Sequence, residues 1–170
     1  MALIDISIDS KIEDKVLWAE NCFNDRKETL LSDPKIRDLI IALKKAVTDS
    51  RKKMEDIGLV DECRQCEEAE GGTCCGAGIE NRYSGILLLI NLLLGRNLPE
   101  HAPGAGSCFF LGPLGCTLTA KHVICINYIC RKITDRINPE KLAGLRDLEG
   151  TELNLLFLLN ERIKMILRSK

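Results

Sequence analysis

The chain has 170 residues, with 24 lysines and arginines against 25 acidic residues, and nine cysteines. This length fits one domain that folds without obligatory cross-links, and the near balance of charge gives no indication of a nucleic-acid or anionic-membrane partner. The N-terminus lacks the basic start and apolar run of a secretory signal, and the apolar run "ILLLINLLL" at 86–94 is too short for a membrane span. We therefore expect a soluble, cytoplasmic protein, in which clustered cysteines favour metal binding or catalysis over disulfides.

Two helices are predicted in the N-terminal flank. Apolar residues recur at helical spacing over 12–30 and again over 36–57. Between them, Asp33 and Pro34 are the cap residue and first-turn proline typical of a helix start. Because the joint "LLSDP" is short, residues 1–62 are predicted to form an antiparallel helical hairpin that acts as a scaffold.

The middle of the chain, residues 63–130, has a different composition. It holds eight of the nine cysteines and ten of the 13 glycines, which is typical of loops around a site. Within it, "SGILLLINLLLG" at 84–95 is apolar on nearly every face and predicts a buried helix that its last glycine ends. The turn "GPLG" at 112–115 is predicted to fold Cys108 and Cys116 toward each other in a small hairpin.

Helices are predicted again in the C-terminal part, residues 131–170. A short helix is expected over 138–144, and a separate last helix is expected to begin at a cap formed by Thr151. The predicted fold class is therefore mostly α. We expect a single domain over 1–170, a helical bundle with one irregular cysteine-rich metal-binding region that contains the small hairpin.

The cysteines form two groups of four, separated by the predicted buried helix. A C-x2-C spacing lets two thiolates reach one metal ion from a tight turn. Thiolates from distant segments need a positive centre to remain together, so the two groups indicate a shared metal site. The candidate metal ligands are Cys63, Cys66, Cys74, Cys75, Cys108, Cys116, Cys125 and Cys130.

Some of these residues have a second interpretation. The stretch "TAKHVICINYIC" is predicted to be helical, which places Cys125 one turn after His122 and turns Cys130 to another face. Both cysteines can therefore be core residues instead of ligands. Adjacent side chains diverge, so only one of the Cys74 and Cys75 pair is expected to ligate a given centre. His122 is interpreted as a neighbour of the ligands, and Cys22 as a buried free cysteine of the first helix.

Both cysteine groups resemble the YkgJ-like, or CxxCxxCC, family of cysteine-cluster proteins, which are described as zinc- or iron-chelating. The resemblance rests on Cys63, Cys66 and the doublet of Cys74 and Cys75, followed by "CFFLGPLGC" and then by "KHVIC". It covers about residues 63–130. A similar cluster occurs in flagellin lysine methylases, where it is thought to hold an iron–sulfur cluster. The resemblance implies metal binding and names no reaction.

The cofactor and the function class both stay open between alternatives. An all-thiolate set suits an iron–sulfur cluster, of the 4Fe-4S type, and zinc alike, while the apolar setting of "CFFLGPLGC" favours iron and sulfur. The chain is interpreted as a metal-holding module, an iron–sulfur enzyme or redox protein related to protein lysine methylases, or a thiol redox sensor. No motif names a substrate, so an enzymatic reaction is not assigned, and the protein or small-molecule partner is unknown.

Overall fold

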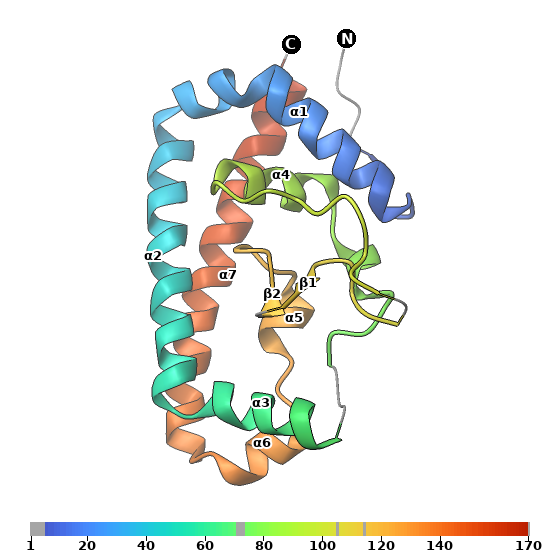
Figure 1. Cartoon of the computed structure of the whole chain (residues 1–170). Coiled ribbons are helices and arrows are strands. Elements are labelled where there is room, and N and C mark those ends of the chain that lie inside the picture. Colours follow the sequence, from blue (N-terminus) through green and yellow to red (C-terminus); the bar gives the residue numbers. More distant parts are fainter. Residues whose placement is uncertain (1–5, 71–73, 105, 114, 170) are drawn as a thin grey trace.

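The computed structural model describes residues 6–70, 74–104, 106–113 and 115–169, with the backbone alone over 66–70. The chain is mostly helical with one small two-stranded hairpin, as the sequence predicts (Figure 1). The elements are α1 (Ile12–Ser32), α2 (Pro34–Asp56), α3 (Leu59–Glu70), the 3-10 helix η1 (Ile79–Arg82), α4 (Gly85–Leu93), β1 (Leu111–Gly112), β2 (Gly115–Cys116), α5 (Val123–Asn127), α6 (Arg131–Arg136) and α7 (Pro139–Arg168). Within these ranges, no helix has both the length and the apolar composition that a membrane span requires.

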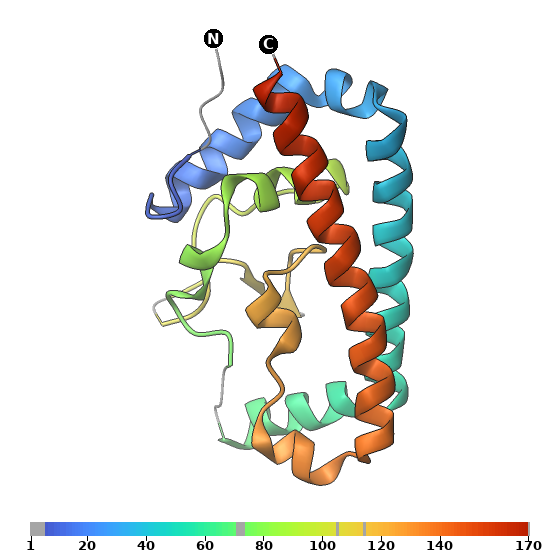
Figure 2. The same ribbon diagram turned by 180° about the vertical axis from the view of Figure 1, so that it is seen from behind.

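The two longest helices, α2 and α7, run antiparallel along the length of the molecule (Figures 1 and 2). Each begins at a polar cap: an Asp33 oxygen accepts a hydrogen bond from the N–H of Ile36 at 2.9 Å, and an Asn138 oxygen accepts one from the N–H of Glu140 at 2.8 Å. Arg162 of α7 forms an ion pair with Asp33. This hydrogen-bonded pair lowers the pKa of Asp33 and joins the C-terminal part of α7 to the start of α2.

Helix α7 is one helix of 30 residues, so the prediction of two helices with a break before Thr151 is wrong. Its buried positions follow one continuous stripe in steps of three or four residues, and two of them are Glu149 and Glu152. Glu152 accepts a hydrogen bond from the Ser50 hydroxyl at 2.6 Å, and Glu149 pairs with Arg146 at 2.7 Å. Burial raises the pKa of Glu149. Carboxylates normally lie at the surface, so Glu149 and Glu152 interrupt the apolar pattern in the sequence. That pattern therefore does not reveal that the helix is continuous.

Helix α4 is the buried helix that the sequence predicts. Its residues 85–91 are all buried, Ser84 caps it by accepting a hydrogen bond from the N–H of Leu87 at 3.2 Å, and the chain leaves it through Gly95 at φ +87°. A helix with this many buried apolar residues needs cover on most sides, and α1 supplies part of it. Helix α1 packs chiefly against α4 and diverges from α2 at their junction, so α1 and α2 do not form the predicted antiparallel hairpin (Figure 1).

The packing of α1 on α4 is tight at Gly85. An added Cβ atom there would lie 2.5 Å from Cε3 of Trp18 and 2.7 Å from Cγ2 of Ile6. We therefore expect Gly85→Ala to lower the free energy of unfolding by about 1–3 kcal/mol through overpacking. Gly150 of α7 has no atom within 4 Å of the same position, so Gly150→Ala should raise that free energy by about 0.5–1 kcal/mol. Urea denaturation checks both signs, and a Gly85→Ala protein as stable as the unchanged chain would contradict this packing.

Helices α3 and α6 form the end of the molecule opposite α1 and α4 (Figures 1 and 2). A second, smaller hydrophobic cluster lies there, built around Leu59, Ile133 and Leu145. An ion pair of 2.6 Å between Arg136 and Glu62 also links α6 to α3. This end is held mainly by its own small cluster, apart from the main core around α4.

Candidate metal centre

The C-x2-C pair lies on a helix, and the tight turn that the sequence predicts for it is not present. Residues 59–70 form α3, which Leu59 anchors in the second hydrophobic cluster, and the Cys63 side chain is exposed. The Cys66 side chain and residues 71–73 lie outside the described part of the chain. Glutamate, glutamine and arginine are good helix formers, and they outweigh the turn preference read from the cysteine spacing.

Backbone pairing of two loops brings Cys75 and Cys108 together. The N–H of Cys108 donates to the carbonyl of Cys75 at 2.9 Å, and the N–H of Ala77 donates to the carbonyl of Gly106 at 3.0 Å. An isolated antiparallel bridge lies between these two hydrogen bonds. The loop after α3 is therefore fixed against the loop that enters the hairpin, with Cys108 buried and Cys75 exposed.

The hairpin and α5 supply two further thiols, Cys116 and Cys125. Strands β1 and β2 pair antiparallel, which confirms the predicted hairpin, but the residue opposite Cys116 is Leu111 and not Cys108. His122 caps helix α5, since its Nδ1 accepts a hydrogen bond from the N–H of Ile124 at 3.2 Å. Both cysteines are half-buried, so their sulfurs lie at the boundary between the core and the surface.

Together, Cys75, Cys108, Cys116 and Cys125 form what we call the central cysteine group. Desolvation is the main cause that raises the pKa of Cys75, Cys108 and Cys125, to about 11 for Cys108. Neighbouring thiols add to it: the charge of Cys116 acts on the other three, and that of Cys125 also acts on Cys75. Cys75, Cys108 and Cys125, which come from separate segments, therefore each lie within electrostatic range of Cys116.

The remaining cysteines lie outside this group. The predicted helix over 119–130 is wrong in length, because α5 covers only Val123–Asn127. Cys130 stands at the N-cap position of α6 without a capping hydrogen bond from its side chain, and it packs against the second hydrophobic cluster. Cys74 is exposed beside Cys75, and of Cys75, Cys108 and Cys125 its charge acts on Cys75 alone. Cys22 is fully buried in the main core, as its position on α1 predicts.

The four thiols match the donor type of both zinc and iron–sulfur sites, but they do not lie at ligand distances. Among the side chains that the structure describes, no three cysteine, histidine, aspartate or glutamate groups are close enough to hold one metal ion. Metal binding would therefore require the sulfurs to draw closer, with binding coupled to local folding.

Tyr83 is a buried residue that orients this site. Its hydroxyl accepts a hydrogen bond from the backbone N–H of His122 at 3.1 Å and donates one to Sγ of Cys125 at 3.7 Å, while its ring lies 5.1 Å from that of Phe110. Burial raises the pKa of Tyr83, so the hydroxyl stays a donor. The only sequence signal for this role is a tyrosine next to a buried helix, where its hydroxyl needs a partner.

We expect Tyr83→Phe to lower the free energy of unfolding by about 1–3 kcal/mol, because the N–H of His122 loses its partner in a half-buried position. Tyr128, with 59% of its surface exposed, offers a matched control. Tyr128→Phe should change that free energy by less than about 0.5 kcal/mol. Denaturant titration of the two variants tests this, and an equally stable Tyr83→Phe protein would show that the hydroxyl does not fix the start of α5.

Asn91 of α4 holds the segment that connects the hairpin to α5. Its side-chain oxygen accepts hydrogen bonds from the N–H groups of Thr119 at 2.8 Å and Ala120 at 2.9 Å, and its nitrogen donates to the carbonyl of Ala120 at 2.9 Å. Arg51 of α2 adds a bond to the carbonyl of Leu118 at 3.1 Å. A lone asparagine in the run "ILLLINLLL" is itself a signal, since buried polar groups are hydrogen-bonded.

Comparison with known proteins gives no relative from which a function could be carried over. No protein-family model matches the chain, and neither do the curated proteins or the solved structures.

Proposed function

We propose that the chain is a metal-binding protein that holds an iron–sulfur cluster or zinc between cysteine thiols. The observation that supports this most is the central cysteine group, in which three thiols from separate segments each lie within electrostatic range of the fourth, Cys116. Hydrophobic packing gives no reason for four thiols to gather in one place. Coordination of one metal centre by the four thiolates gives such a reason. The motif resemblance to YkgJ-like proteins favours the same class.

Four thiols are also the number that both cofactors use most often. Cys75, Cys108, Cys116 and Cys125 are therefore the first candidate set. Cys63, Cys66, Cys74 and Cys130 remain candidates as further ligands or for a second centre. No reaction follows from the thiols alone, so a role as an iron–sulfur enzyme related to protein lysine methylases stays an alternative.

The raised thiol pKa values count against a thiol redox sensor at Cys75, Cys108 and Cys125. A sensor cysteine needs a lowered pKa, because the thiolate is the reactive form. Desolvation does the opposite at Cys75, Cys108 and Cys125. A bound metal ion reverses this effect, because it deprotonates the thiols that coordinate it.

Metal analysis of protein purified without oxygen tests the proposal. For an iron–sulfur cluster we expect iron and acid-labile sulfide in near-equal amounts and a brown protein with broad visible absorption. Colourless protein with stoichiometric zinc would assign the zinc alternative. Metal-free protein with two or more native disulfides among these cysteines would overturn both.

A further inference from the structure

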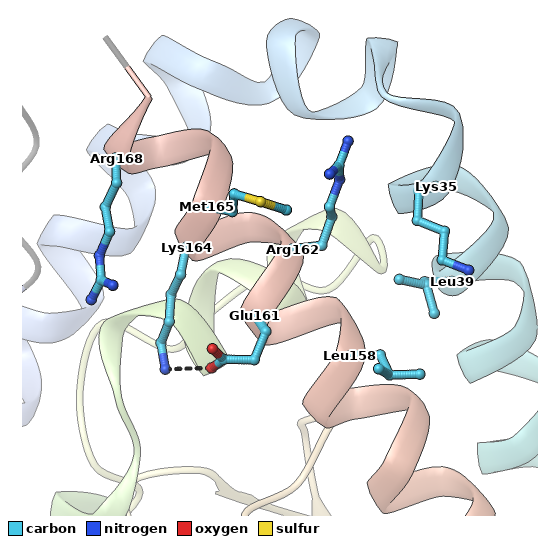
Figure 3. Close-up of a pocket in the computed structure, with 8 residues that line it drawn as sticks. All are labelled: Lys35, Leu39, Leu158, Glu161, Arg162, Lys164, Met165 and Arg168. Carbon is cyan, nitrogen blue, oxygen red and sulfur yellow. Dashed lines mark hydrogen bonds and ion pairs between the residues drawn. The ribbon is translucent and has the colours of Figure 1, made fainter.

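A groove of about 540 Å³ lies between the start of α2 and the C-terminal part of α7, far along the chain from the central cysteine group (Figure 3). Leu39 projects from α2 towards α7, the Lys35 side chain runs alongside α2, and Leu158 and Met165 lie along α7. The ion pair between Arg162 and Asp33 fixes the two helices at this place. The groove is therefore a feature of the scaffold with a defined shape.

The floor of the groove is apolar and partly open to solvent. Leu39 is buried, while 41% of Leu158 and 53% of Met165 is exposed. Leu158 and Met165 are seven residues apart, which is about 10.5 Å along a helix. Anchor side chains at positions i and i+7 of a partner helix have the same spacing. Methionine also adapts its shape to different partners.

The rim of the groove is cationic, although the whole chain has a net charge of −1. Glu161 pairs with Lys164 at 2.9 Å, and Arg162 pairs with Asp33. Among the residues that the structure describes, Lys35 and Arg168 form no ion pair.

Helix electrostatics account for Arg168 but not for Lys35. Arg168 ends α7, where the helix macrodipole favours a cation. Lys35 stands in the first turn of α2, where the macrodipole disfavours one. An anionic partner across the groove would offset that cost.

We propose that this groove binds an acidic amphipathic helix of a partner protein. Leucine-like anchors of that helix would contact Leu39, Leu158 and Met165, and its carboxylates would face Lys35 and Arg168. This arrangement uses two features of the surface: the apolar side chains at helical spacing on the floor of the groove, and the cationic rim.

The probe is a labelled helical peptide with leucines at i, i+3 and i+7 and glutamates at the other positions, titrated with the full chain by fluorescence anisotropy. We expect saturable binding at low salt that weakens at high salt. The double variant Lys35→Glu with Arg168→Glu and the single variant Met165→Ser should each weaken binding about tenfold or more. The matched controls are Lys44→Glu and Ile41→Ser, which alter exposed residues of α2 outside the groove and should leave binding unchanged.

Several outcomes would overturn this assignment. These are no binding of the peptide at low salt, an equal loss in the control variants, or tight binding that Met165→Ser does not weaken. If sedimentation showed self-association, and Met165→Ser abolished it, the occupant of the groove would be a second copy of the chain instead. Binding to phosphatidylglycerol vesicles without binding to the peptide would give it to a lipid surface.

Discussion

On the metal-binding function proposed above, Cys116→Ser should lose the metal, because Cys116 is the thiol whose charge acts on the other three members of the central cysteine group. Loss of a ligand should exceed the 10–100-fold drop in metal affinity that follows the loss of a residue that merely supports a ligand. Cys125→Ser should behave in the same way. Metal content after anaerobic purification measures the effect, and protease sensitivity of the segment 74–130 should rise with it, since metal binding is coupled to local folding.

The matched control is Cys22→Ala, which removes a fully buried thiol from the main core. It should keep the full metal content and cost about 0.5–3 kcal/mol of stability. Cys75→Ser should lose more metal than Cys74→Ser, because Cys75 interacts with Cys116 and Cys125. If Cys116→Ser and Cys125→Ser both retained metal, or if Cys22→Ala lost it, the centre would lie elsewhere in the chain.

Variants of Cys63 and Cys130 test the other end of the molecule. Both lie near α3 and α6, apart from the central cysteine group. If Cys63→Ser or Cys130→Ser lost part of the metal, and the metal that remained kept its visible spectrum, this would indicate a second metal centre at that end.

Much of the helical framework could be predicted from local sequence signals. Three local signals each carry a backbone preference that acts over a few residues: Asp33 with Pro34, Ser84 with Gly95, and the "GPLG" turn. At these places the structure forms a helix start, a buried helix and a hairpin. The predictions that were wrong concern features that depend on long-range packing. Glu149 could not be recognised as buried without its partner, and the cover of α4 by α1 depends on contacts far apart in sequence.

The candidate site shows the same division. The sequence identifies which thiols are clustered, but it divides them at the buried helix, whereas the structure joins Cys75 with Cys108 through paired loops and leaves Cys130 with α6. That pairing has no periodic signal. Likewise, the Tyr83 hydroxyl donates a hydrogen bond to Cys125, and no residue spacing in the sequence predicts this contact.

Asn91→Leu should lower the free energy of unfolding by about 3 kcal/mol or more. Leucine keeps the volume, but it leaves both N–H groups of Thr119 and Ala120 and the carbonyl of Ala120 without their partner. Each buried polar group that loses its partner costs about 1–3 kcal/mol, and Ala120 is fully buried. Asn154, which is exposed on α7, offers the matched control, and Asn154→Leu should change the stability by less than about 0.5 kcal/mol.

The same change has a second expected effect, because the segment that Asn91 holds joins Cys116 on β2 to Cys125 on α5. Once that segment is released, the two sulfurs lose their fixed relation, and metal content should fall although no thiol has been removed. Urea denaturation and metal analysis of Asn91→Leu and Asn154→Leu measure the two effects. A loss of stability with full metal content would separate the anchor from the site, and a loss of less than 1 kcal/mol would show that water replaces the amide at Thr119 and Ala120.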